Sequence, residues 1–198
     1  MSGRLRALLI APPGAGKGTQ AHAISAEFGV EHISTGALFR AQVAAGTEVG
    51  RTVAGYLDRG DLVPDDLVEV LVREKVRDAV AATGGYLLDG FPRTLAQAHA
   101  AHAFAEDLGI TAHAVLTFDT PRPVLLARLL GRGAGGRTDD EETTIRHRLD
   151  VFDAETAPVL DYYAGLGVLI HIDGDQPVTE VTRATIAALR AAVASAPA

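Results

Sequence analysis

The sequence predicts an α/β fold in which a central, five-stranded parallel sheet lies between layers of helices. Short apolar segments alternate along the chain with longer segments of helical periodicity, and glycine or proline residues separate many of them. Strands that are connected through helices lie parallel, and the helices then cover both faces of the sheet. The 198 residues are enough for one domain of ordinary size.

Five short apolar runs are interpreted as the strands of this sheet. The first ends in a turn rich in glycine and proline, the third ends at Asp89, and Asp119 follows the fourth. Each run is only a few residues long, which favours a strand over a helix. The strands are expected at residues 5–10, 32–33, 86–89, 113–118 and 168–172.

The helices are delimited mainly by glycine and proline. Gly29 and Gly60 end two of them, because glycine adopts the left-handed conformation that closes a helix. Pro64 with two following acids marks a helix start, and Pro158 is expected to bend a long helix near the C-terminus. The helices are expected at residues 19–28, from 34–36 onward, 48–59, 64 to about 82, 94–108, 121–130, 138–164 and 177–196.

Composition and charge exclude several function classes. The formal net charge of −7 argues against nucleic acid or an anionic membrane as the main partner. The chain has no cysteine, which excludes disulfides, thiol catalysis and a cysteine-type zinc site. We find no apolar run that could span a bilayer and no signal peptide before the first strand. We therefore expect a cytoplasmic protein with small-molecule partners.

Residues 11–20, with the sequence Ala-Pro-Pro-Gly-Ala-Gly-Lys-Gly-Thr-Gln, predict a phosphate-binding loop. Gly14, Gly16 and Gly18 allow backbone N–H groups to turn toward a polyphosphate, and the following helix directs its positive end to the same place. Lys17 adds a mobile charge that can follow a phosphoryl group. An ordinary turn is the structural alternative, but lysine is rarely placed between glycines for packing alone.

A second group of polar residues is expected at the same edge of the sheet. In parallel sheets ligands bind at the carboxyl ends of the strands, where Asp89 and residues 90–93 are predicted to lie. Thr35 is expected to cap the second helix, and Arg40 follows about one turn later. Taken alone, Arg40 could be a solvated surface residue and Asp89 a turn residue. Their position near a phosphate-binding loop favours a role in binding.

Several ordered motifs resemble those of the adenylate kinase family. Residues 11–20 resemble its loop G-x-P-G-x-G-K-G-T-Q, and residues 87–94 resemble its L-L-D-G-F-P-R-T. Shorter matches occur at I-S-T-G (33–36), L-V-P-D (62–65) and the lid pattern from residue 136 to 143. Together they cover nearly the whole chain.

The resemblance implies a P-loop three-layer fold with a helical monophosphate-binding insert and a short lid. A single domain, 1–198, would comprise a core of residues 1–33, 64–130 and 142–198, a monophosphate-binding segment 34–63 and a lid 131–141. The family transfers a phosphoryl group reversibly from ATP to AMP, giving two ADP, and uses Mg²⁺. The short lid lacks the cysteines of zinc-containing relatives, so we expect no zinc, and we expect a monomer.

The resemblance also assigns roles to individual residues. The donor nucleotide would be held by Gly14, Ala15, Gly16, Lys17, Gly18, Thr19, Arg132 and Gln176. The acceptor site would comprise Thr35, Arg40, Asp61, Leu62, Val63, Gly90, Phe91, Pro92, Arg93, Gln97, Arg137 and Arg148. The catalytic residues would be Lys17, Arg93, Arg132, Arg137 and Arg148, and Asp89 would bind the metal through water.

Two alanines depart from the family pattern. Ala11 stands where the first glycine of the loop is usual, and Ala37 stands where the family usually has an acid after S-T-G. These departures keep two alternatives open. One is a UMP/CMP-type monophosphate kinase, and the other is a nucleotide-binding regulatory protein with impaired turnover.

Overall fold

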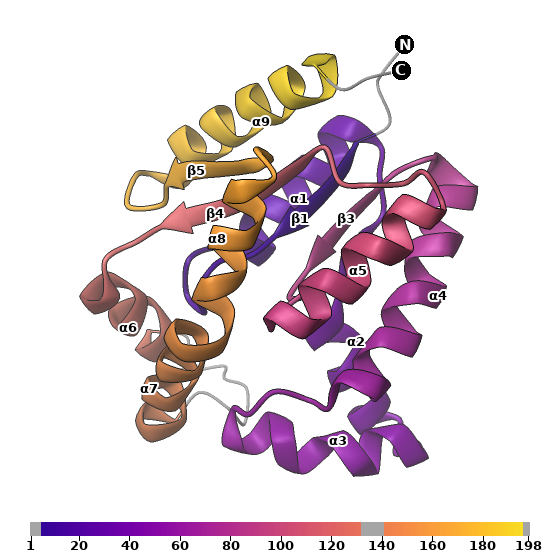
Figure 1. The fold of residues 1–198 in the computed structure, drawn as a ribbon. Coiled ribbons are helices and arrows are strands. Elements are labelled where there is room, and N and C mark those ends of the chain that lie inside the picture. Colours follow the sequence, from indigo (N-terminus) through magenta and orange to yellow (C-terminus); the bar gives the residue numbers. More distant parts are fainter. Residues whose placement is uncertain (1–4, 132–140, 196–198) are drawn as a thin grey trace.

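The computed structural model describes residues 5–131 and 141–195. Its centre is a parallel sheet with the strand order β2-β3-β1-β4-β5 (Figure 1). The predicted α/β fold with a five-stranded parallel sheet is therefore confirmed. The strands are β1 (Arg6–Leu9), β2 (His32–Ser34), β3 (Tyr86–Asp89), β4 (Ala114–Asp119) and β5 (Leu169–Asp173).

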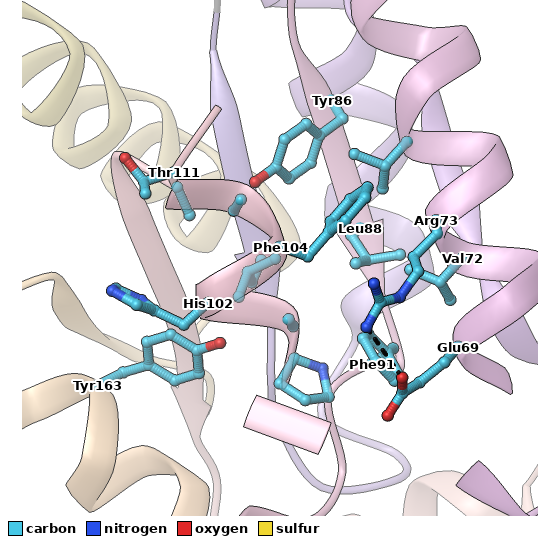
Figure 2. A pocket seen from close by; sticks show the side chains of 16 residues that line it. Glu69, Val72, Arg73, Tyr86, Leu88, Phe91, His102, Phe104, Thr111 and Tyr163 are labelled. Carbon is cyan, nitrogen blue, oxygen red and sulfur yellow. Dashed lines mark hydrogen bonds and ion pairs between the residues drawn. The ribbon is translucent and has the colours of Figure 1, made fainter. Parts of the chain in front are cut away.

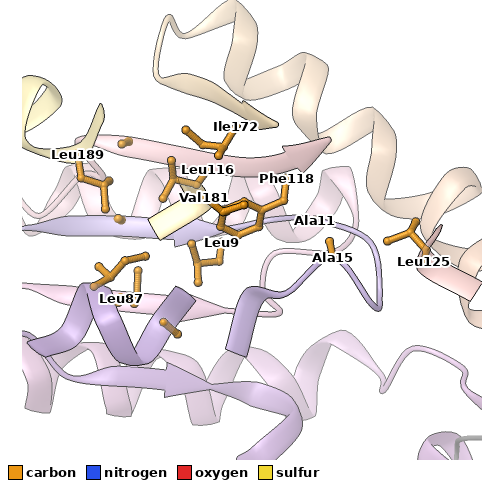
Figure 3. Close-up of a cluster of buried hydrophobic side chains, with 14 of the residues drawn as sticks. Leu9, Ala11, Ala15, Leu87, Leu116, Phe118, Leu125, Ile172, Val181 and Leu189 are labelled. Atoms are coloured by element: carbon orange, nitrogen blue, oxygen red, sulfur yellow. The ribbon is translucent and has the colours of Figure 1, made fainter. Parts of the chain in front are cut away.

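Helices pack against both faces of the sheet, so each face has its own apolar core. In β1, Leu9 belongs to one core and Leu8 to the other, because successive side chains of a strand point to opposite faces. The core with Leu9, Leu116 and Phe118 is closed by α1 (Lys17–Phe28) and α9 (Val178–Ser195) (Figure 3). Burial on both faces explains why the strands read as apolar runs without alternation.

The two helices that precede and follow β3 cover much of the opposite core. Val72 and Val76 of α4 (Asp65–Thr83) and Ala98 of α5 (Leu95–Asp107) pack there against Leu88. Each fully buried valine or leucine side chain contributes roughly 1.5–3 kcal/mol relative to exposure to water. The loops at the ends of the strands are therefore held on a rigid frame.

Two short helices form an insert between β2 and α4, α2 (Thr35–Ala44) and α3 (Glu48–Arg59) (Figure 1). They approach so closely that a Cβ atom at Gly50 would lie 2.1 Å from the backbone oxygen of Gln42. A glycine is therefore required at this contact. α3 begins and ends at the residues expected from the sequence.

The long helix expected at residues 138–164 is interrupted, which corrects the prediction. The structure has α7 (Glu142–Val151), a π-helical turn (Phe152–Thr156) and α8 (Ala157–Gly165). Pro158 lies in the first turn of α8, where its missing N–H is tolerated, and its ring excludes a continuous α-helix through the preceding turn. The wider π-helical turn accommodates this exclusion. Residues 138–140 lie outside the described residues.

The remaining helix, α6 (Arg122–Leu130), follows β4 and precedes the segment that the structure does not describe. In residues 5–131 and 141–195, no helix combines the length and the apolar character that a bilayer-spanning segment needs.

Candidate active site

A cavity of about 750 Å³ opens at the carboxyl ends of β1, β2 and β3. Its wall includes Ile10, Ser34 and Asp89, which lie at or just beyond the ends of these strands. The glycine loop, α2, residues 89–93 and α7 complete it. This is the edge of the sheet at which α/β proteins bind ligands, as the sequence predicted for these loops.

The glycine loop has the backbone geometry that a phosphate site needs. Gly14 and Gly16 have φ angles of +85° and +98°, which side-chain-bearing residues rarely adopt. A Cβ atom at Gly14 would also lie 2.9 Å from the carbonyl oxygen of Leu125. Gly16 caps α1, and the residues from Gly16 to Thr19 line the cavity. The positive end of α1 therefore faces the cavity.

Lys17 lies across this loop. Its Nζ donates hydrogen bonds to the carbonyl oxygens of Ala11, at 2.6 Å, and Pro12, at 3.0 Å. These contacts hold the ammonium group at the edge of the cavity, between the loop and the strand ends. The Lys17 ammonium group therefore lies beside the loop that is expected to bind an anion.

Asp89 presents an ionised carboxylate to the same cavity. Its side chain is almost buried, and burial alone would raise the pKa of this carboxyl. His32, Lys17 and Arg93 outweigh that effect and hold the pKa of Asp89 below its usual range. Nε2 of His32 lies 3.5 Å from Oδ2 of Asp89. An ionised carboxylate is the kind of ligand that binds Mg²⁺ or its water shell, so the residues fit this metal.

Thr35 connects the insert to the loop after β3. Its Oγ1 donates to the carbonyl oxygen of Gly90 at 3.0 Å and is 3.3 Å from that of Asp89. The helix cap expected from Thr35 comes instead from Ser34, whose Oγ accepts from the backbone N–H of Ala37 at 3.4 Å. The hydroxyl of Thr35 is engaged in a tertiary contact and is not available as a cap.

Three guanidinium groups converge on the cavity. Arg40 from α2, Arg93 from the loop after β3 and Arg148 from α7 all line it. Nε of Arg93 donates to the carbonyl oxygen of Gly90 at 2.7 Å, which fixes the group in place. Burial, with repulsion from Arg148 and Arg40, lowers the pKa of Arg93, while Asp89 opposes this shift. Positive charges gathered against their mutual repulsion indicate an anionic ligand.

A smaller cavity of about 30 Å³ adjoins the insert. Apolar side chains, including Phe39 and Val68, form much of its wall, and Gln97 contributes the amide of a buried side chain. Oε1 of Gln97 accepts from the backbone N–H of Arg93 at 2.7 Å. The predicted acceptor residues that meet here are Thr35, Asp61, Leu62, Val63, Gly90, Arg93 and Gln97.

Some predicted site residues are not part of these cavity walls. Gln176 is exposed after β5, and its Nε2 donates to Oδ2 of Asp173 at 2.8 Å. Ala15 and Phe91 bury their side chains in the two apolar cores, which leaves only their backbones for a ligand. Arg132 and Arg137 lie outside the described residues.

His32 is a residue of this site that the sequence did not single out. It lies on β2, which pairs with β3, and it lines the main cavity beside His22. The two imidazole rings meet edge to face, with centroids 6.1 Å apart. The available signal was its position two residues before Ser34 at the end of a strand.

The two unusual alanines fit their positions. In the described residues only glycines have positive φ angles, so Ala11 needs no special backbone conformation. Ala11 is 5% exposed and packs in the core of Figure 3. Ala37 is exposed in the first turn of α2 and lines the main cavity. Neither alanine is held in a left-handed backbone conformation that would require a glycine.

Restoring the family residues is therefore expected to change stability more than turnover. Ala11→Gly removes a buried methyl group and adds backbone freedom, which costs about 1 kcal/mol, or about 2–4 °C in Tm. Ala37→Asp adds an acid at the positive end of α2, worth about 0.3–1 kcal/mol of stabilisation. Thermal unfolding and ADP formation by each variant measure both effects. Turnover that appears only after both changes would contradict this expectation and favour a regulatory protein.

A third cavity, of about 50 Å³, lies between the sheet and helices α4 and α5 (Figure 2). Several of its polar groups are already paired with other protein groups. The hydroxyl of Tyr86 donates to the carbonyl oxygen of Ile110 at 3.0 Å, and Arg73 pairs with Glu69 at 3.1 Å. The rest of the wall is mainly apolar, as Leu88 and Phe104 in Figure 2 illustrate. This cavity lacks the convergent charges of the main one.

Comparison with known proteins identifies the relatives of this chain. Residues 9–168 match a family model described as adenylate kinase. The chain is 49% identical to the adenylate kinase of Mycobacteroides abscessus, over 93% of this chain and 99% of that protein. It is 46% identical to that of Kocuria rhizophila, over 93% and 98%, and 43% identical to that of Thermobifida fusca, over 94% and 98%.

Proposed function

This chain belongs to the adenylate kinase family, and we propose that its main cavity holds the phosphates of ATP and AMP in position for transfer. The protein is a phosphotransferase that catalyses the reversible reaction of ATP with AMP to give two ADP. The observation that carries the site assignment is the convergence of Arg40, Arg93 and Arg148 with the glycine loop on one cavity. Phosphoryl transfer depends mainly on positioning and on neutralising charge, which this arrangement supplies.

On the donor side, the proposal assigns the triphosphate to the glycine loop and the first turn of α1. Backbone N–H groups between Gly14 and Thr19 would bind the phosphate oxygens. Lys17 would exchange its contacts with Ala11 and Pro12 for the phosphoryl group that is transferred. Gln176 would make at most a peripheral contact, because it lies outside the wall of the main cavity.

On the acceptor side, the proposal places the base of AMP in the smaller cavity, against Gln97, and its phosphate between Arg40 and Arg93. Residues 34–63, which contain α2 and α3, would form the monophosphate-binding segment. The lid at residues 131–141, with Arg132 and Arg137, would complete the set of arginines and exclude water. We propose that the protein acts on free nucleotides as a cytoplasmic monomer.

Members of the adenylate kinase family use ATP with Mg²⁺, and Asp89 is the residue proposed to hold the metal through its water shell. When bound, Mg²⁺ neutralises charge on the phosphates that are exchanged. The chain's own part is to keep the Asp89 carboxylate ionised, through His32, Lys17 and Arg93.

Asp89→Asn is expected to lower kcat by about tenfold to a hundredfold and to raise the Mg²⁺ concentration needed for half-maximal activity. The amide keeps the shape of the side chain but lacks the negative charge that attracts the metal's water shell. A Mg²⁺ titration of ADP formation, together with calorimetric binding of Mg·ATP, measures the effect. An unchanged Mg²⁺ requirement in both measurements would remove Asp89 from this role.

The function itself is tested by measuring ADP formation from ATP and each monophosphate in turn. We expect AMP to be the preferred acceptor, with UMP and CMP much poorer, because Gln97 offers hydrogen bonds suited to adenine. A preference for UMP or CMP would favour the pyrimidine alternative. Binding of ATP without transfer to any acceptor would favour the regulatory alternative.

A further inference from the structure

The side-chain amide of Gln97 is held between two partners of opposite polarity. Its Oε1 accepts from the backbone N–H of Arg93 at 2.7 Å, and its Nε2 donates to Oδ1 of Asp65 at 2.6 Å. Gln97 is only 2% exposed, so water cannot readily replace either partner. The backbone N–H of Gln97 is also fixed, because it donates to Oγ1 of Thr94, the cap of α5.

The polarity of these partners determines which way the amide is turned. A backbone N–H only donates hydrogen bonds, and a carboxylate only accepts them. Rotation of the amide by half a turn would place its NH₂ group against the N–H of Arg93 and its oxygen against the Asp65 carboxylate. Both contacts would be repulsive in a buried environment, where unsatisfied polar groups are expensive. The observed orientation is therefore strongly selected.

The fixed amide leaves one N–H and one oxygen lone pair for a ligand, in a set order. Gln97 lines the smaller cavity, whereas Asp65 does not. A 6-aminopurine presents the N1 acceptor beside an N6 donor, which matches the two free groups of Gln97. A 6-oxopurine presents an N1–H donor beside an O6 acceptor, which is the reverse order. The orientation of one amide thus separates these two classes of base.

We propose that Asp65 is a positioning residue for acceptor specificity, which makes the site select a 6-aminopurine monophosphate over a 6-oxopurine monophosphate by fixing the Gln97 amide. This inference rests on the proposed placement of the acceptor base against Gln97. Asp65 lies in the first turn of α4, where an acid is ordinarily explained by the positive end of a helix. That explanation applies equally to Asp66, but the contact with Gln97 is made by Asp65.

The test compares AMP with inosine monophosphate, whose base carries an oxygen in place of the 6-amino group. In Asp65→Asn, we expect the ratio of kcat/KM for AMP to that for inosine monophosphate to fall by about tenfold, mainly through KM. The loss is partial because the N–H of Arg93 still favours the native orientation, and because the amide oxygen of the substituted side chain can still accept from Nε2 of Gln97 when it faces that group. Asp66→Asn removes the same charge from the same helical turn at an exposed position, and we expect it to leave the ratio unchanged.

If Asp65 had a purely structural role, its replacement would lower kcat/KM for both monophosphates alike and leave their ratio unchanged. Gln97→Ala and the double variant complete the experiment, because an effect that acts through Gln97 disappears in its absence. Calorimetric binding of both monophosphates gives a second readout that needs no turnover.

Three outcomes would overturn the inference. If the preference for AMP is unchanged in Asp65→Asn but lost in Gln97→Ala, the role of Asp65 is rejected and the proposed base site at Gln97 stands. An unchanged ratio in both variants rejects the inference together with the proposed base site. An equal fall in Asp66→Asn assigns the effect to the charge at the helix end and also rejects the inference.

Discussion

Replacing Lys17 with alanine is expected to lower kcat for ADP formation by about a hundredfold to a thousandfold while the protein stays folded. The ammonium group is held at the edge of the main cavity by the carbonyl oxygens of Ala11 and Pro12. A charge in this place stabilises the transferred phosphoryl group in the transition state, when its bonds to both neighbouring oxygens are weakest. The side chain belongs to the first residue of α1 and lies outside both apolar cores, so its removal leaves the core packing intact.

Lys75→Ala provides the matched control, because Lys75 is the only other lysine in the sequence. It lies on α4 and pairs with Asp78 at 3.8 Å, a surface contact worth at most about 1 kcal/mol. We expect this variant to keep its kcat. Initial rates with saturating ATP and AMP, and thermal unfolding of both variants, separate turnover from stability. Near-normal turnover in Lys17→Ala would contradict the assignment of the phosphate loop.

The sheet and most helix ends could be predicted because local chemistry determines them. β3 lies at the residues expected from its apolar run, and α3 ends at Gly60, whose φ angle of +77° requires a glycine. Signals of this kind depend on a few neighbouring residues and are visible without the fold. The placement of the glycine loop at the edge of the sheet follows from the parallel topology alone.

Features that depend on tertiary contacts could not be predicted in the same way. Ser34 and Thr35 are adjacent hydroxyl residues, and either could cap α2 from sequence alone. The carbonyl oxygen of Gly90, more than fifty residues further along the chain, decides between them by binding Thr35. The π-helical turn before α8 is a similar case, since Pro158 indicated a bend but not the residues at which the helix would widen.

The residues of the candidate site also fall into those that local sequence indicates and those that depend on tertiary contacts. The loop residues near Lys17 and the strand-end Asp89 were indicated by motifs that are contiguous in the sequence. The contact between Asp65 and Gln97 joins two residues that are 32 positions apart and lie on different helices, and no local pattern indicates it. Specificity in this fold is therefore harder to predict than phosphate binding, because it depends on how separate elements orient one amide.

Arg93→Met is expected to lower kcat/KM for AMP at least about a hundredfold while KM for ATP changes little. A guanidinium that binds a phosphate through two charge-assisted hydrogen bonds contributes about 1.5–3 kcal/mol for each of them. Arg93 is preorganised for this role, because its Nε donates to the carbonyl oxygen of Gly90 at 2.7 Å. Methionine fills much of the same space without the charge. Initial rates with AMP varied at fixed ATP, and the reverse, measure the difference.

Two further variants show which property of Arg93 matters. Arg93→Lys restores the charge without the planar fork, so we expect only partial recovery of KM for AMP. Arg73→Met is the matched control, because Arg73 is bound to Glu69 and lies over the Phe104 ring beside the apolar cavity of Figure 2. We expect its kinetics to stay unchanged. If Arg93→Met instead raised KM for ATP and AMP equally, Arg93 would bind the phosphoryl group that is transferred. Binding of the AMP phosphate would then depend mainly on Arg40. The ratio of the two KM changes therefore decides how the converging arginines divide the phosphates between them.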